Sequence, residues 1–342
     1  MMKEIILPIT PFISFWFKDC FHMSLLPVLN QILGNADCIK YNQFFHYVLT
    51  EEGIAGFNNE FNNLFEIMKY KDINFYLEPT NDIISEINQA LFAKYYVVVG
   101  IDNYYEEKRK DFFNKKHNGH SITIFGSNIK KESFWVLEQP FFYSYNYSQM
   151  EIKQDNIELG YQSFLNNIEN NDFFYNTLSS ISRINGRDIP SSCFISGEGL
   201  SREKKDNLSI SNYINKYLAN QQTIYRNLEN IKLYERDFEY YYLKCVDATV
   251  GNKSINNLSK LINDKQIECY LMNNIVDIVN GGKENNDVIN YWTQIRSYIS
   301  KFVYSHVINK EHIHIGQQLI KDIYYLEKNY YSKIFRKLKK VR

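Results

Sequence analysis

The chain has 342 residues, of which 44% are hydrophobic and 23% are charged, a composition typical of an ordinary globular protein. Its 39 basic and 39 acidic side chains balance, which argues against a nucleic-acid-binding protein. No segment approaches the roughly 20 uninterrupted apolar residues that a membrane-spanning helix needs. The length allows one large domain or two modest ones.

Cysteine usage indicates a reducing compartment. Residues 1–8 lack the apolar core and the small-residue cleavage site of a signal peptide, so we expect a cytoplasmic protein. The odd number of cysteines and their scattered positions predict free thiols, with neither a disulfide framework nor a cysteine zinc site. The five cysteines are Cys20, Cys38, Cys193, Cys245 and Cys269.

The first predicted element is a helix from about Asp19 to Leu33. Its apolar residues recur at helical spacing on one broad face. Asp19 is a suitable N-cap, which places Cys20 in the first turn, and Gly34 provides a stop signal.

The next stretch is predicted to form β-strands. Residues 95–101 make a continuous run of β-branched and aromatic side chains, typical of a buried strand. Residues 121–126 and 133–137 follow as two further strands, joined by a short polar connection that predicts an antiparallel hairpin. A polar, aromatic and basic loop, residues 103–119, separates the first strand from the second.

After about residue 150 the strand signal fades and helical patterns dominate. Apolar residues at three- and four-residue spacing predict helices over 207–244, 255–279, 288–308 and 312–339. We therefore expect an α+β fold, with a catalytic domain over residues 1–150 and a mainly helical region over residues 151–342.

Three residues together suggest nucleophilic chemistry. Cys20 at a helix start would have its thiolate stabilised by the helix dipole, although a cysteine there is by itself more often a small buried hydrophobe. His120 opens one strand of the hairpin, and Glu138 closes the other. A hairpin centred near residue 129 pairs position 120 with position 138, so the carboxylate could orient the imidazole. A thiol, a histidine and an acid in this order form the papain arrangement.

The motifs that carry these residues resemble a known family. Residues 97–105, 118–126 and 135–140 resemble the butirosin-biosynthesis-H-like N-terminal domain, a member of the papain-like cysteine peptidase superfamily. The resemblance covers roughly residues 14–142. It implies a papain-like fold with an antiparallel sheet, with Cys20 as nucleophile, His120 as base and Glu138 in the acid position.

The resemblance also implies a reaction. Such enzymes move an acyl group from the 4′-phosphopantetheine thioester of an acyl carrier protein to an amine, a diamine being one candidate. No cofactor or metal bound to the chain itself is implied. The chain departs from the family pattern in having Glu138 where Asp is usual, and Gln139 before Pro140. No Gln precedes Cys20 to bind an oxyanion, so Ser14 and Thr10 are the candidate second donors.

The loop residues suggest where substrates would bind. Asp102, Tyr104 and Tyr105 are candidate substrate-binding residues. The two tyrosines and the aromatic run 141–143 could line a dry acyl channel. Ordinary core packing explains these aromatic side chains equally well. An acidic carrier protein would favour the basic residues 108–110 together with 115–116.

Two other functions fit the same residues. A hydrolase could use this triad to cleave peptides or amides, and a non-catalytic module could keep the fold and only bind. Trapping an acyl group on Cys20 separates an enzyme from a binding module. Amine-dependent release of that group separates a transferase from a hydrolase.

Overall fold

The computed structural model describes residues 4–11, 20–34, 41–60, 74–76, 82–140, 147–168, 192–196, 207–276 and 282–341. The chain forms two compact units. The first contains Met1–Ile39 and Asn62–Lys205, and the second contains Lys40–Phe61 and Asp206–Arg342. These boundaries differ from a single cut at residue 150. The division into a catalytic domain and a helical region stays a prediction.

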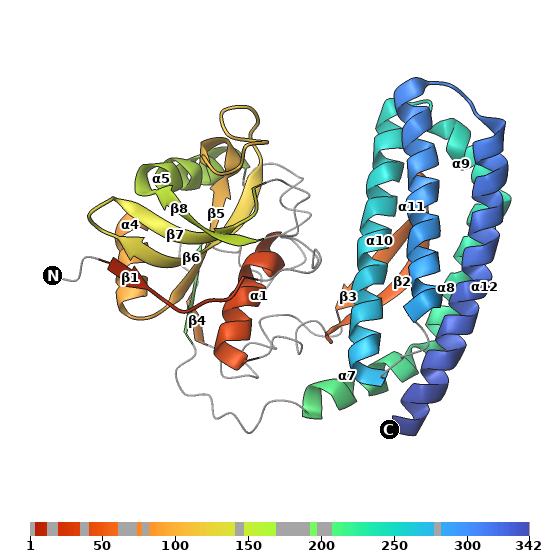
Figure 1. Ribbon diagram of the computed structural model, residues 1–342, viewed down its shortest axis with the longest axis horizontal. Coiled ribbons are helices and arrows are strands. Elements are labelled where there is room, and N and C mark those ends of the chain that lie inside the picture. Colours follow the sequence, from red (N-terminus) through yellow and green to blue (C-terminus); the bar gives the residue numbers. More distant parts are fainter. Residues whose placement is uncertain are drawn as a thin grey trace. The chain divides into compact units, whose positions relative to one another are not determined.

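The first unit combines an antiparallel sheet with helices on its faces (Figure 1). Its elements are β1 (Glu4–Ile6), α1 (Cys20–Leu33), β4 (Asn74–Tyr76), α4 (Ile83–Phe92), β5 (Tyr96–Asp102), the 3-10 turn η1 (Asn103–Tyr105), β6 (Gly119–Asn128), β7 (Ser133–Glu138), β8 (Ser148–Lys153), α5 (Gln154–Ser163), the π-helical turn η2 (Phe164–Ile168) and β9 (Ser192–Ser196). The predicted α+β class with an antiparallel sheet is confirmed.

Within the described residues the sheet has seven strands, in the order β4-β9-β5-β6-β7-β8, with β1 paired to the far end of β6. The three strands predicted from the sequence are β5, β6 and β7, and β6 and β7 form the expected antiparallel hairpin. We had expected the strands to end near residue 150, and this expectation is wrong. Strand β9 pairs with both β4 and β5, which makes a segment beyond residue 190 part of the sheet.

The two faces of the sheet are covered by different helices. Alternate residues of β5 and β6, among them Val99 and Ile122, pack into one apolar core with α4 and α5. The intervening residues of β6 face α1, where the Ser24 hydroxyl donates to the Ser121 carbonyl over 2.6 Å and the Thr123 hydroxyl donates to the Ser24 carbonyl. Because side chains alternate along a strand, α1 lies on the face opposite to α4 and α5.

Helix α1 begins at Cys20, as predicted. Gly34, directly after the helix, has a φ of 72°, the left-handed conformation that glycine adopts without a steric penalty. The predicted cap Asp19 lies outside the described residues. Cys20 is therefore the first residue of a helix that ends at the glycine stop.

The second unit is mainly helical and includes one hairpin from the N-terminal half of the chain. Its elements are β2 (Gln43–Thr50), β3 (Gly53–Glu60), α7 (Asn207–Ala219), α8 (Gln221–Arg236), α9 (Phe238–Lys244), α10 (Ala248–Val276), α11 (Gly282–Ser305) and α12 (Lys310–Val341). The expected helix over 207–244 is three helices, whereas the other three predicted helices correspond to α10, α11 and α12. Strand β2 packs on α8 and β3 on α10. At the closest approach, a Cβ added to Gly56 would lie 2.9 Å from the Leu261 backbone.

A buried ionic cluster holds the hairpin to the helices. The Lys265 ammonium donates to Glu268 and to Glu327, each over 2.7 Å, and all three side chains are excluded from solvent. The Tyr47 hydroxyl of β2 donates to the other oxygen of Glu327 over 2.5 Å. We call Lys265, Glu268 and Glu327 the Lys265 cluster. Among the described helices of both units, none is long and apolar enough to cross a membrane.

Candidate active site

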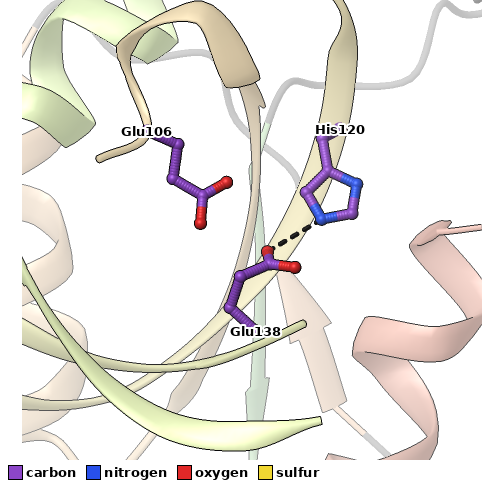
Figure 2. Close-up of side chains that lie close together, drawn as sticks. All are labelled: Glu106, His120 and Glu138. Carbon is purple, nitrogen blue, oxygen red and sulfur yellow. Dashed lines mark hydrogen bonds and ion pairs between the residues drawn. The ribbon is translucent and has the colours of Figure 1, made fainter. Parts of the chain in front are cut away.

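The His120 imidazole and the Glu138 carboxylate form a buried pair at one end of the sheet. Nε2 of His120 lies 2.8 Å from Oε2 of Glu138, and the two side chains are 3% and 0% exposed (Figure 2). An ionised carboxylate can only accept, so Nε2 carries the proton in this pair and donates it to Glu138. The second ring nitrogen, Nδ1, points away from Glu138 and is left with a lone pair. The imidazole is therefore held in the tautomer that a general base needs.

The strand register that brings His120 and Glu138 together differs from the predicted one. The hairpin turns further along the chain than predicted, because Asn128 pairs with Ser133. A bulge between Ile124 and Gly126 then moves the pairing by one residue, and Thr123 lies opposite Leu137. Continuing this register puts position 138 opposite position 122, and the predicted pairing of 120 with 138 is wrong. His120 and Glu138 are instead diagonal neighbours on one face, a separation that two long side chains can bridge.

Arg109 contacts both members of the pair. Its Nη1 lies 3.5 Å from Oε1 of Glu138 and 3.4 Å from Nε2 of His120, and its guanidinium also pairs with Asp111 at 3.1 Å. The same oxygen of Glu138 accepts from the backbone N–H of Gln139 over 2.6 Å. Glu138 therefore accepts from His120, Arg109 and the Gln139 backbone. The side chain of Arg109 is fully buried, so the expectation that residues 108–110 together form a basic docking face is wrong at Arg109.

Glu106 adds a second carboxyl group without a hydrogen-bond partner. Its side chain is 1% exposed, and neither oxygen has a hydrogen-bond partner in the described part of the chain. Figure 2 shows this group directed toward Glu138. Burial raises the pKa of Glu106 well above its usual value, and the charge of Glu138 raises it further. Glu106 therefore holds a proton more readily than an ordinary glutamate.

Glu106, His120 and Glu138 each offer one ligand atom, and these atoms lie within 4.8 Å of one another. A divalent ion would need both carboxylates ionised and would lie beside the fixed positive charge of Arg109. That guanidinium already occupies the cation position next to Glu138. The arrangement therefore suits proton transfer better than metal binding.

Cys20 is the first residue of α1, the helix on the sheet face opposite to α4 and α5. Its thiol is half-buried and is in no disulfide among the described residues. Ser24, one turn further along α1, bonds to Ser121, the residue after His120. Tyr147 provides a second link, because the pKa of its phenol is raised well above its usual value by burial and then by the charges of Glu138 and Cys20.

The other described thiols are poor nucleophiles. Burial raises the pKa of Cys245, and burial together with Glu268 raises the pKa of Cys269 to about 12 in spite of the nearby Lys265. Cys20 alone among these three is only partly buried, and it lies at a helix N-terminus, where backbone N–H groups favour a thiolate.

The expected substrate-binding residues anchor the loop before β6. Both oxygens of Asp102 accept hydrogen bonds, Oδ1 from the backbone N–H groups of Tyr104 and Asn118 and Oδ2 from Ser163. Oδ2 also pairs with Nδ1 of His117 at 2.6 Å. With this set, Asp102 has little capacity left for a substrate amine.

Tyr104 and Tyr105 are half-buried, as a channel lining would require, and pack edge to face at 5.1 Å. Tyr104 also stacks on His117 at 4.4 Å. Their assignment to substrate binding stays a prediction. The aromatic residues 141–143 and the candidate donor Ser14 lie outside the described residues, and Thr10 is exposed on the segment after β1.

Sequence reasoning missed Arg109, Glu106 and Tyr147. The segment from Asn103 to Gly119 reads as a solvated polar loop, and no local pattern distinguishes its buried charges from its exposed ones. Only the folding of this loop against the ends of β6 and β7 buries Glu106 and Arg109. Comparison of the chain with protein-family models and with curated proteins gives no match.

Proposed function

We propose that this protein is a cysteine-dependent acyltransferase that moves an acyl group from a carrier-protein thioester, through Cys20, to an amine. The observation that carries the proposal is the buried pair of His120 and Glu138. A carboxylate fixed on Nε2 leaves Nδ1 of the imidazole as the base that the proposal assigns to Cys20. A papain-like fold and a place in thiotemplated biosynthesis belong to the same proposal.

In the first step, His120 takes the thiol proton and the thiolate of Cys20 attacks the thioester carbonyl. As the new carbon–sulfur bond forms, the π-electron pair of the thioester C=O bond moves onto the oxygen. Collapse of this intermediate breaks the bond to the carrier thiol, which takes the proton from His120 and leaves an acyl-Cys20 enzyme. Exchange of one thioester for another is close to neutral in free energy.

In the second step, an amine replaces the carrier. It attacks the acyl-Cys20 carbonyl and His120 accepts its proton, which passes to the departing Cys20 sulfur. Glu138 stabilises the imidazolium in both steps and does not itself exchange a proton. Amide formation is favourable, so this step makes the transfer irreversible. Water would compete for the same intermediate and give a hydrolase.

The test is the intact mass of the protein after incubation with acyl thioesters of N-acetylcysteamine. We expect the wild type to gain one acyl group, and Cys20→Ala to gain none. Cys245→Ala is the matched control, since it removes a buried thiol from the other unit and should still be acylated.

The acyl-enzyme is then mixed with diamines or with buffer alone. Faster discharge by a diamine, with the amide as product, supports a transferase. Discharge at the same rate in buffer would identify a hydrolase. Absence of any adduct on the wild type, with Cys20 also unreactive toward iodoacetamide, would refute the nucleophile assignment.

A further inference from the structure

His117 presents an exposed imidazole whose orientation is fixed by a buried carboxylate. Its Nδ1 lies 2.6 Å from Oδ2 of Asp102, and the two side chains are 56% and 0% exposed. An ionised carboxylate can only accept, so Nδ1 carries a proton and donates it to Asp102. The ring also stacks on Tyr104, with centroids 4.4 Å apart and an interplanar angle of 12°. These contacts hold the imidazole in one orientation and leave Nε2 without a hydrogen bond to the described residues.

Asp102 does not need this histidine for its own hydrogen bonding. Its Oδ1 accepts from the backbone N–H groups of Tyr104 and Asn118, and its Oδ2 accepts from the Ser163 hydroxyl over 2.7 Å. Both oxygens of the buried carboxylate therefore have a partner even without His117. The contact serves the imidazole, because the bond made by one ring nitrogen decides what the other nitrogen can do. The nitrogen left for a ligand is Nε2.

The segment that leads into His117 is basic. Lys115 and Lys116 directly precede the histidine, and both side chains are exposed and make no ion pair within the described part of the chain. The backbone N–H of Asn114 donates to the Tyr104 carbonyl over 2.9 Å, which holds this segment beside the residue on which His117 stacks. Two ammonium groups and an oriented imidazole thus lie on one short stretch of surface.

The acids of the same loop do not offset these lysines. Glu107 pairs with Lys108, and Asp111 pairs with Arg109. Glu106 is buried, and burial raises its pKa well above the usual value. The surface around His117 therefore favours an anion, and a phosphate oxygen is a strong acceptor for both ammonium and imidazolium donors.

We propose that His117, Lys115 and Lys116 bind the phosphate group of the 4′-phosphopantetheine arm that carries the acyl group. This inference rests on the proposed function, which supplies the identity of the arm. The protonated imidazole donates Nδ1–H to Asp102 and Nε2–H to a phosphate oxygen. The Lys115 ammonium uses one of its three donors on the Lys110 carbonyl, over 2.6 Å, and keeps two for the anion.

The phosphate and the thioester are at opposite ends of the arm. Binding at His117 therefore holds the donor without touching the reacting carbonyl, and no bond of the donor forms or breaks there. His117 lies two residues before β6, the strand whose second residue is the candidate base His120. Loss of the phosphate contact should weaken binding of the donor and leave the chemistry of the thioester unchanged.

The experiment compares two acyl donors that differ only in the phosphate. Acylation of Cys20 by acyl-4′-phosphopantetheine and by acylpantetheine is followed as intact mass, at donor concentrations below saturation. We expect the wild type to react faster with the phosphorylated donor. His117→Phe keeps a ring to stack on Tyr104 and removes both nitrogens, while Asp102 keeps its three other donors. It should slow the reaction of the phosphorylated donor by about 10- to 100-fold, the effect of losing a hydrogen bond to a charged group, and leave acylpantetheine unaffected.

His314→Phe is the matched control, because His314 is an exposed histidine of α12 in the second unit, and it should keep the wild-type preference. A wild type without preference for the phosphorylated donor, or an unchanged preference in His117→Phe, would overturn the inference and leave the proposed function intact. Equal slowing with both donors would also overturn it, since that pattern indicates a structural role.

Isothermal titration separates this inference from the proposed function. We expect 4′-phosphopantetheine to bind His117→Phe at least about 10-fold more weakly than the wild type, and pantetheine to bind both proteins equally. Inorganic phosphate that binds as tightly as 4′-phosphopantetheine would overturn the assignment to the arm. Binding of 4′-phosphopantetheine that depends on His117, in a protein that no thioester acylates at Cys20, would refute the proposed reaction and support the phosphate site.

Discussion

The guanidinium of Arg109 lies 3.5 Å from the carboxylate of Glu138, and both side chains are fully buried. This contact places a buried positive charge beside the pair of His120 and Glu138. With Arg109 positive and Glu138 negative, the buried charges balance when Glu106 holds its proton. The pair of His120 and Glu138 therefore depends on a residue eleven positions before the histidine, in a loop without regular structure after η1.

Replacing Arg109 should destabilise the protein. Arg109→Met leaves the Glu138 carboxylate buried without its cation, which typically costs about 3–5 kcal/mol of unfolding free energy. Urea unfolding at neutral pH measures the change. Lys108→Met is the control, since Lys108 is 38% exposed and pairs with its neighbour Glu107, and it should change stability by less than about 0.5 kcal/mol. A loss as small for Arg109→Met would show that Glu138 does not depend on this cation.

Removing the charge of Glu138 should impair catalysis. Glu138→Gln keeps a similar shape but can no longer stabilise an imidazolium, and the comparable change in a catalytic triad costs roughly 10⁴-fold. We expect acylation of Cys20 by thioesters to fall by about 10²- to 10⁴-fold, as followed by intact mass. Glu151→Gln, on the half-exposed edge strand β8, is the control and should react at the wild-type rate. A wild-type rate for Glu138→Gln would contradict its orienting role.

Glu106 should make stability fall as pH rises. Its folded-state pKa is raised above the unfolded value, so the folded protein binds the proton more tightly than the unfolded chain does. The resulting stabilisation is complete below the unfolded pKa of about 4.3 and is lost as pH increases through the raised folded pKa.

Glu106→Gln removes this titration and keeps a neutral side chain of the same size. Unfolding free energies measured from pH 4 to pH 8 should therefore fall less steeply with pH in the variant than in the wild type. Glu107→Gln changes a neighbouring, partly exposed acid and should retain the wild-type slope. Identical slopes for Glu106→Gln and the wild type would show that Glu106 does not carry a raised pKa.

In the helical unit, two buried carboxylates depend on the cation of Lys265, much as Glu138 depends on Arg109. Lys265→Met leaves Glu268 and Glu327 as two buried carboxylates without a cation, at a cost of about 3–5 kcal/mol. Thermal unfolding followed by circular dichroism should show a clearly lowered midpoint. Lys260→Met, at an exposed position of the same helix, should not.

Neutralising the two acids tests the electrostatic cause. The triple variant Lys265→Met, Glu268→Gln, Glu327→Gln removes the unbalanced charge, and we expect it to recover part of the stability lost by Lys265→Met. A triple variant no more stable than the single one would assign the loss to packing against the aromatic rings of Tyr330 and Tyr331, over which the Lys265 ammonium lies.

The sequence by itself determined the elements whose signals are local. Hydrophobic periodicity predicted α1 and the three longest helices, and runs of β-branched residues predicted β5, β6 and β7. The order of these elements brought His120 and Glu138 to one end of a hairpin. Each of these results needs only side-chain spacing and neighbouring segments of the chain.

The tertiary structure decided what depends on distant contacts. The position of the turn and the bulge at residues 124–126 together set the register of β6 and β7. Arg109 became part of the site because its loop folds against two strand ends. The β2–β3 hairpin joined helices some 150 or more positions further along the chain through Tyr47 and the Lys265 cluster. Whether a charged side chain is buried depends on which segments of the chain pack together, and the segments that pack here are far apart in the sequence.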